Sequence, residues 1–148
     1  LEGTGVDISE EALAVAKENG SRLNVSVTWT LSNLFENISG EFDLIVSNPP
    51  YIRTDVIQSL EDEVKLHDPW IALDGHDDGL YFYRRIVNES IFYMKAGGWL
   101  MFEIGYDQAK EVSELMEKAG FSHVYVKKDL AGLDRCVCGM YNKRVVKN

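Results

Sequence analysis

The sequence has no long apolar run and holds few cysteines. No run approaches the ~18 residues that a membrane-spanning helix needs, and no signal-peptide pattern is visible. The chain has two cysteines, Cys136 and Cys138, and its three histidines lie elsewhere in the sequence. A reduced, buried cysteine pair is therefore favoured over a metal or redox site. We expect a soluble protein of the cytoplasm, with no metal and no membrane contact.

Positively charged residues are fewer than negatively charged ones. The 148 residues include 15 lysines and arginines against 24 aspartates and glutamates, which gives a net charge of −9. Such an acidic chain is a poor partner for phosphate backbones, so we expect no direct nucleic-acid binding. The basic residues near the C-terminus are interpreted as a solvated face and tail, with a local basic patch as the alternative: Lys127, Lys128, Lys143, Arg144 and Lys147.

Strand-like and helix-like patterns alternate along the chain. A short apolar segment at 4–8 is followed by expected strands at 25–31, 42–47 and 99–104. Helices are expected at 9–20, 78–94 and 107–120, and the segments 122–127 and 135–141 are expected to close the sheet as an antiparallel pair. Ser9 suits the start of the first helix, and Asn19-Gly20 suits its end. This order predicts an α/β fold with a mostly parallel, doubly wound sheet and an antiparallel C-terminal strand.

Residues 52–76 show little regular pattern. A loop of this length in a compact domain is usually functional or mobile. We therefore predict that this segment is the least ordered internal part of the chain and covers the substrate.

Polar residues follow three of the expected strands. Ligands of doubly wound sheets bind beyond the carboxyl ends of the strands, which places Asp7, Asn33 and the segment 48–51 on one rim. An aspartate in the position of Asp7 can accept hydrogen bonds from both hydroxyls of a ribose, with Ile8 against an adenine. A helix cap or a surface acid is the alternative reading of Asp7.

The segment Asn48-Pro49-Pro50-Tyr51 ends the strand at 42–47. Both residues that precede a proline are pushed to extended geometry, and proline has no N–H group. The segment therefore offers carbonyl oxygens, the side-chain oxygen of Asn48 and the flat ring of Tyr51. Two acceptors and a ring suit a planar group with an NH2, whose nitrogen needs a strong electrophile such as a sulfonium methyl donor. A strand terminator without chemistry is the alternative.

At these residues the chain resembles the amino-methyltransferases that use S-adenosylmethionine. The later stretches "DGLYFYRRI", "GGWLMFEIGYDQ", "AGF" and "KDLAGLDR", with "EV" at 63–64, "DP" at 68–69 and "AL" at 72–73, resemble the HemK-like release-factor glutamine methyltransferases. The resemblance spans residues 4–141. It implies a Rossmann-like methyltransferase that methylates the glutamine in the Gly-Gly-Gln loop of peptide chain release factors.

The resemblance also implies site residues. The implied catalytic residues are Asn48, Pro49, Pro50 and Tyr51. The implied cofactor-binding residues are Asp7 at the ribose, Ile8 at the adenine, Asn33 and Leu34 beside the adenine, and again Asn48. Two residues depart from the family pattern, which usually has aspartate in place of Asn33 and often has Glu-Pro in place of Asp68-Pro69.

Two parts of the family pattern have no counterpart in the sequence. These are the first strand with its glycine-rich Asp-x-Gly-x-Gly-x-Gly loop, and an N-terminal helical domain that binds the substrate. We therefore expect residues 1–148 to be a partial catalytic domain, from the second strand to the C-terminus, that binds cofactor weakly and is inactive alone. Without the first strand, two sheet edges are expected to lack a partner. Partner strands, an altered sheet or an oligomer of the chain remain open.

Two other functions remain open at this point. The Asn-Pro-Pro-Tyr segment is shared with adenine and guanine amino-methyltransferases of nucleic acids. An α/β fragment that only folds or associates, without catalysis, would also satisfy the fold.

Overall fold

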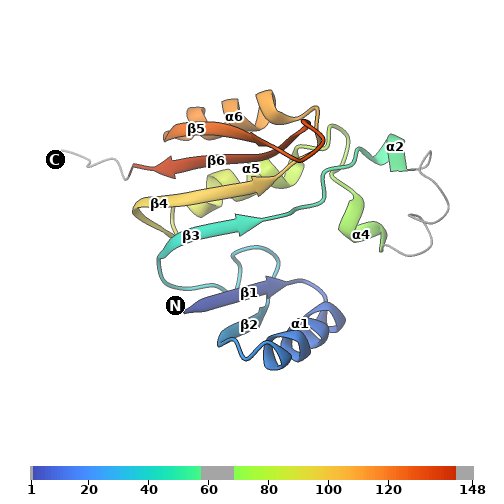
Figure 1. Ribbon diagram of the computed structural model, residues 1–148, viewed down its shortest axis with the longest axis vertical. Coiled ribbons are helices and arrows are strands. Elements are labelled where there is room, and N and C mark those ends of the chain that lie inside the picture. The colour runs from blue at the N-terminus through green and yellow to red at the C-terminus, as the bar shows by residue number, and fades with distance from the viewer. Residues whose placement is uncertain (1, 58–68, 143–148) are drawn as a thin grey trace. The chain divides into compact units, whose positions relative to one another are not determined.

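The computed structural model describes residues 2–57 and 69–142, which fall into two compact units, one within Leu1–Gly40 and one within Glu41–Asn148 (Figure 1). The first unit consists of strand β1 (Gly3–Asp7), helix α1 (Glu10–Arg22) and strand β2 (Val27–Leu31). The two strands are parallel, with Asp7 opposite Leu31. A helix that crosses between two parallel strands is the arrangement that the sequence predicts.

Helix α1 begins where the sequence predicts, because the Ser9 hydroxyl accepts a hydrogen bond from the Ala12 amide at 3.1 Å. The prediction that Asn19-Gly20 ends the helix is wrong, since the helix continues to Arg22. Gly20 is buried, and a Cβ added there would lie 3.4 Å from the Trp29 ring. Gly20 therefore packs against the Trp29 side chain inside the helix and does not end it.

The second unit contains a four-stranded mixed sheet. Its strands are β3 (Phe42–Ser47), β4 (Met94–Glu103), β5 (Phe121–Lys128) and β6 (Asp134–Tyr141), in the spatial order β3-β4-β6-β5 (Figure 1). Strands β3 and β4 are parallel, whereas β6 is antiparallel to both β4 and β5. The closing antiparallel pair is confirmed. The sheet is therefore mixed: β3, β4 and β5 run in the same direction, and β6 alone runs opposite to them, as the sequence predicts for the C-terminal strand.

Four strands have one neighbour each in the part of the chain that the structure describes, and β1 and β3 are two of them. Strand β1 pairs with β2, and β3 pairs with β4. Apolar side chains of these strands are exposed: Val6 is 40% exposed, Leu44 49% and Val46 67%. Both strands therefore present backbone groups and apolar side chains at an edge.

Helices α5 (Tyr81–Ser90) and α6 (Ala109–Lys118) contact each other, and α6 packs on β5 and β6. Between helices and sheet lies the core, where the rings of Tyr83 and Phe102 meet edge to face at 5.1 Å. The most deeply buried apolar side chains are Tyr83, Ile86, Val87, Met94, Leu100, Phe102, Ile104, Val112, Met116 and Val137. This core holds the carboxyl ends of β3 and β4 in fixed positions.

The helical spacing of apolar residues predicts the wrong end for helix α5. The sequence predicts a helix that continues to Met94, but α5 ends at Ser90 and Met94 is the first residue of β4. Gly97 has a φ of +79°, and the pairing of β4 with β3 shifts register at this point. Gly97 therefore lies at an irregularity within β4, whereas the sequence predicts that this strand begins only at residue 99.

The segment 52–76 is described only in part, since residues 58–68 lie outside the described residues. These include Glu63, Val64 and Asp68 of the family resemblance. The prediction that residues 52–76 are the least ordered internal part of the chain is therefore not tested there. The flanks hold two short helices, α2 (Thr54–Ile57) and α4 (Trp70–Leu73), joined by a parallel bridge between Ile52 and Asp74. The Thr54 hydroxyl donates to the Asp74 carboxylate at 2.7 Å, and this bond lowers the pKa of Asp74. The expectation of little regular structure is therefore wrong for the flanks.

The cysteine pair lies on β6, with both thiols free, Cys136 half-buried and Cys138 buried. Burial raises the pKa of the Cys138 thiol. No group of three or more ligand side chains within residues 2–57 and 69–142 could hold a metal ion, and none of the helices in these ranges is long and apolar enough to cross a membrane. Of the basic residues near the C-terminus, Lys128 pairs with Asp134 at 2.6 Å, while Lys143, Arg144 and Lys147 lie outside the described residues.

Two glycine substitutions test how α1 and α6 end. Gly20→Ala is expected to stabilise α1 by about 0.5–1 kcal/mol, because alanine is the better helix residue and its Cβ makes an ordinary contact with Trp29. Gly120→Ala, after α6, is expected to destabilise by about 1–2 kcal/mol, because its φ is +95°. Hydrogen exchange measures both changes: the α1 amides are expected to exchange more slowly in Gly20→Ala, and the α6 amides faster in Gly120→Ala. Faster exchange of the α1 amides in Gly20→Ala would contradict the proposed packing against Trp29.

Candidate functional site

The segment Asn48–Tyr51 begins where β3 ends and lies at the same edge of the sheet as the carboxyl end of β4, because Ser47 is opposite Phe102. Asn48 is exposed, Pro49 is buried, and Pro50 and Tyr51 are half-buried. Within the described residues, neither the Asn48 side chain nor the Pro49 carbonyl makes a hydrogen bond. The exposed Asn48 side chain is therefore available to accept a hydrogen bond from a ligand, whereas the Pro49 carbonyl belongs to a buried residue.

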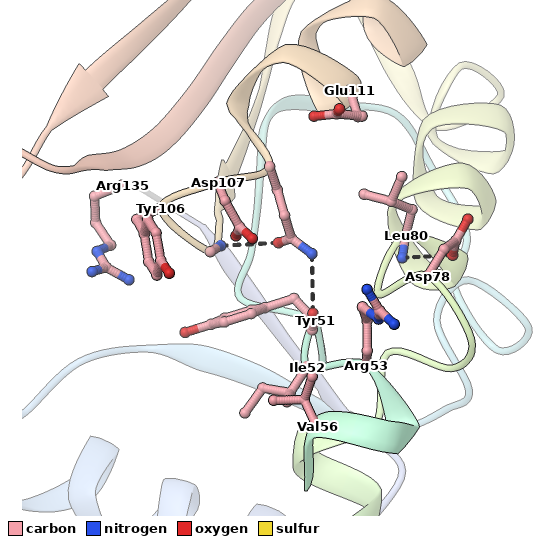
Figure 2. A pocket seen from close by; sticks show the side chains of 12 residues that line it. Tyr51, Ile52, Arg53, Val56, Asp78, Leu80, Tyr106, Asp107, Glu111 and Arg135 are labelled. Carbon is pink, nitrogen blue, oxygen red and sulfur yellow. Dashed lines mark hydrogen bonds between the residues drawn. The ribbon is translucent and has the colours of Figure 1, made fainter. Parts of the chain in front are cut away.

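A cavity of about 620 Å³ lies beside this segment, within the second unit (Figure 2). Its lining residues come from the segment after β3 with α2, the loop before α5, the turn between β4 and α6 with the first turn of α6, and β6; of the segment Asn48–Tyr51, only Tyr51 lines it. They are Tyr51, Ile52, Arg53, Val56, Asp78, Leu80, Gly105, Tyr106, Asp107, Gln108, Glu111 and Arg135. The ring of Tyr51 extends on the same side as Tyr106 and Arg135 (Figure 2). The predicted ring of the site therefore faces a cavity that a side chain could enter.

Most charges around the cavity are paired. Arg53 binds Asp55 at 2.6 Å, and Arg135 binds Asp129 at 3.2 Å. Asp78 accepts from Arg84 at 2.7 Å, a bond that lowers the pKa of the Asp78 carboxyl.

Two further carboxylates on the wall, Asp107 and Glu111, have no ion pair among the residues that the structure describes. The remaining charge of the cavity is thus negative. An uncharged amide or a cation is accommodated there more readily than an anion.

A buried hydroxyl supports the cavity floor. Tyr83 is fully buried, and burial raises its pKa well above the ordinary value, so the hydroxyl keeps its proton. It donates to the Glu103 carbonyl at 2.9 Å, at the end of β4. The hydroxyl thereby ties α5 to the edge of the sheet where the cavity opens.

The other predicted residues lie in the first unit. The Asp7 carboxylate accepts from the Ser9 amide with Oδ1 at 2.8 Å, and its Oδ2 makes no hydrogen bond within the described residues. The Ser32 amide donates to the Asp7 carbonyl at 2.9 Å, which brings the ends of β1 and β2 together. Ile8 is 54% exposed. The free carboxylate oxygen and the apolar side chain therefore lie side by side in the sequence at one strand end.

Asn33 and Leu34 follow β2 in a tight turn. The Asn33 amide donates to the Glu36 carboxylate at 2.8 Å, and the Ser32 hydroxyl donates to the Leu34 carbonyl at 3.0 Å. Leu34 has a φ of +53°, which is uncommon for a residue other than glycine. The hydrogen bonds of Ser32 help to hold this conformation, and both residues are half-buried.

The structure thus assembles two groups of predicted residues, Asp7, Ile8, Asn33 and Leu34 in the first unit and Asn48–Tyr51 in the second. Sequence reasoning missed Gln108, Gly79, Tyr83 and Arg135. Gln108 follows the strand predicted at 99–104, so the strand-end rule that selected the other residues also applies to it. For Gly79, Tyr83 and Arg135 no comparable signal exists in the sequence, because their roles depend on contacts with distant residues.

The fold and this site define the class of protein: an α/β methyltransferase fold with a mixed sheet. A family model, "Methyltransferase small domain", matches residues 1–64. A crystal structure of a methyltransferase from Pyrococcus furiosus has a TM-score of 0.68 and 19% identity, covering 94% of this chain and 62% of the other. The N-methyltransferase NodS from Bradyrhizobium japonicum WM9, in complex with S-adenosyl-l-homocysteine, has a TM-score of 0.54 and 16% identity, covering 95% and 66%.

The chain has higher sequence identity to a group of curated proteins than to these solved structures. The chain is 46% identical over 147 residues to the release factor glutamine methyltransferase of Caulobacter vibrioides, across 95% of this chain and 50% of the relative. The chain is therefore a homologue of the release factor glutamine methyltransferases. It spans about half the length of the curated relatives that it matches.

Proposed function

We propose that the protein containing these residues transfers a methyl group from S-adenosylmethionine to the side-chain amide nitrogen of a glutamine in a peptide chain release factor. The observation that carries this proposal is a pair of acceptors after β3, the Asn48 side chain and the Pro49 carbonyl, which have no hydrogen-bond partner among residues 2–57 and 69–142 and lie next to Tyr51 in the chain. The names of the homologous relatives support the choice of substrate.

Asn48 and Pro49 would each take one hydrogen of the substrate amide. An amide nitrogen is a poor nucleophile because its lone pair is delocalised. Two acceptors that hold both N–H bonds return electron density to the nitrogen and fix its direction of attack. The ring of Tyr51 would stack on the planar amide, and Pro50 would keep the segment extended.

The residues of the first unit fit the ribose and adenine part of the cofactor. The Oδ2 of Asp7 is free to accept from ribose hydroxyls, and the exposed Ile8 side chain offers an apolar contact for adenine. Asn33 and Leu34 would flank the adenine, although the amide of Asn33 also binds Glu36. When bound, S-adenosylmethionine supplies the electrophilic methyl group.

Release factors act on ribosomes, so the reaction is proposed for the cytoplasm. The test uses the whole protein with radiolabelled S-adenosylmethionine and three acceptors. These are a release factor, the same release factor with the glutamine of its Gly-Gly-Gln loop replaced by alanine, and an oligonucleotide. Label on the first acceptor alone is the expected result. Label on the oligonucleotide would favour a nucleic-acid amino-methyltransferase, and no label on any acceptor would favour a non-catalytic α/β protein.

A further inference from the structure

Gln108 joins three segments at the cavity. Its Nε2 donates to the carbonyl of Tyr51 at 3.0 Å and to the carbonyl of Gly79 at 3.2 Å, and its Oε1 accepts from the Gly105 amide at 3.0 Å. Tyr51 lies 57 positions away in the sequence and Gly79 lies 29 away. One side chain therefore ties the end of β3, the loop before α5 and the end of β4 together.

The chemistry of the partners fixes the orientation of this amide. Both partners of Nε2 are carbonyls, which only accept, and the Gly105 amide only donates. A second contact of Oε1, with the Tyr83 hydroxyl at 3.4 Å, is the weaker one, because that hydroxyl has a nearer acceptor in Glu103. A carboxylate of the same size would keep the bond from Gly105 but would place negative oxygens against two carbonyls.

The backbone of Tyr51 is enclosed as well as bonded. A Cβ added at Gly75 would lie 2.8 Å from the Cα of Tyr51, and one added at Gly79 would lie 2.5 Å from its carbonyl oxygen. Gly79 also has a φ of +71°, a conformation that glycine adopts without strain. The two glycines therefore leave room for the Tyr51 main chain, and the Gln108 side chain orients its carbonyl.

Unlike its backbone, the side chain of Tyr51 is not held by hydrogen bonds within the described residues. Its hydroxyl makes no hydrogen bond within the described residues, and its ring is half-buried at the cavity. The direction of the ring therefore depends on the backbone that carries it.

We propose that Gln108 is a positioning residue for methyl transfer. It fixes the position of the Tyr51 peptide, and the Tyr51 peptide in turn orients the Tyr51 ring and the acceptors of Asn48 and Pro49 that hold the substrate amide. The inference rests on the proposed function. Gln108 acts through Tyr51, because its NH2 group donates to the Tyr51 and Gly79 carbonyls.

The test compares Gln108→Glu, Gln108→Met and a matched control in the whole protein. Gln108→Glu keeps the size and one acceptor but removes both donors, and Gln108→Met removes the hydrogen bonds altogether. Val112→Ala is the control, because Val112 is fully buried in α6, the helix that Gln108 precedes, and the truncation destabilises α6 without removing a side-chain hydrogen bond of Gln108.

Both Gln108 variants are expected to lower kcat for the release factor by about 10- to 100-fold, because a displacement on the order of 1 Å in a reacting group has an effect of this size. The Kd for S-adenosylmethionine is expected to stay unchanged. Val112→Ala is expected to lower the melting temperature and keep kcat within about twofold at temperatures well below it. A kcat of the Gln108 variants within about twofold of the unaltered protein, or a loss that Val112→Ala reproduces, would overturn the inference.

A second measurement does not depend on activity. Loss of the hydrogen bond to the Tyr51 carbonyl is expected to shift the 13C resonance of that carbonyl in both Gln108 variants, with no such shift in Val112→Ala. If the shift occurs but the unaltered protein methylates no release factor, the proposed function fails and the support of Tyr51 by Gln108 stands. If the unaltered protein is active and the shift is absent, the inference itself fails.

Discussion

Replacing Asn48 by alanine in the whole protein is expected to slow methyl transfer by at least ~10²-fold while the melting temperature hardly changes. The side-chain oxygen of Asn48 is proposed to accept one hydrogen of the substrate amide, and removal of a preorganised hydrogen bond at a reacting group costs roughly 2.7–4 kcal/mol. Asn48 is exposed and makes no hydrogen bond within the described residues, so the fold does not depend on it. Single-turnover kinetics with labelled cofactor and a thermal melt measure both quantities.

Asn88→Ala is the matched control for this variant. Asn88 is exposed in α5, outside the segment Asn48–Tyr51, so the same chemical change there should leave the rate unchanged. Normal methylation by Asn48→Ala would show that Asn48 does not hold the amide. Unfolding of Asn48→Ala would instead favour the reading of Asn48-Pro49-Pro50 as a strand terminator.

The candidate site could be predicted where one short segment carries the chemistry. Asn48–Tyr51 combines two prolines with an amide and a ring directly after a buried strand, and the structure places it at a strand end beside a cavity. Asp7 likewise follows a strand. Such residues can be found from the sequence because the strand itself decides where they lie.

The supporting residues could not be found in this way. Gly79 falls at the start of the helix predicted at 78–94, and only the approach of the Tyr51 carbonyl shows why the position has to be glycine. The same limit explains the errors in the fold. Gly20 continues a helix because Trp29 covers it, and Met94 begins a strand because Phe42 pairs with it. In each case a distant residue overrides the local pattern.

Replacing Asp7 by asparagine in the whole protein is expected to weaken the binding of S-adenosylmethionine by roughly tenfold to 150-fold. The Oδ2 of Asp7 is the free oxygen that would accept from the ribose, and hydrogen bonds to charged groups contribute about 1.5–3 kcal/mol. Asparagine can still accept from the Ser9 amide, so the turn into α1 is kept. Its NH2 group would then face the ribose with a donor in place of an acceptor.

Calorimetry measures the effect of Asp7→Asn on cofactor binding, and kinetics at saturating cofactor measures its effect on methyl transfer. The Kd of Asp7→Asn for S-adenosylmethionine should rise, whereas methyl transfer at saturating cofactor should return close to the rate of the unaltered protein, because the acceptors of Asn48–Tyr51 remain. Asp43→Asn is the control, since Asp43 is exposed in β3 and its pair with Lys95 lies at the surface. An unchanged Kd for Asp7→Asn would return Asp7 to the alternative role of a residue that only turns the chain into α1, through its bond with Ser9.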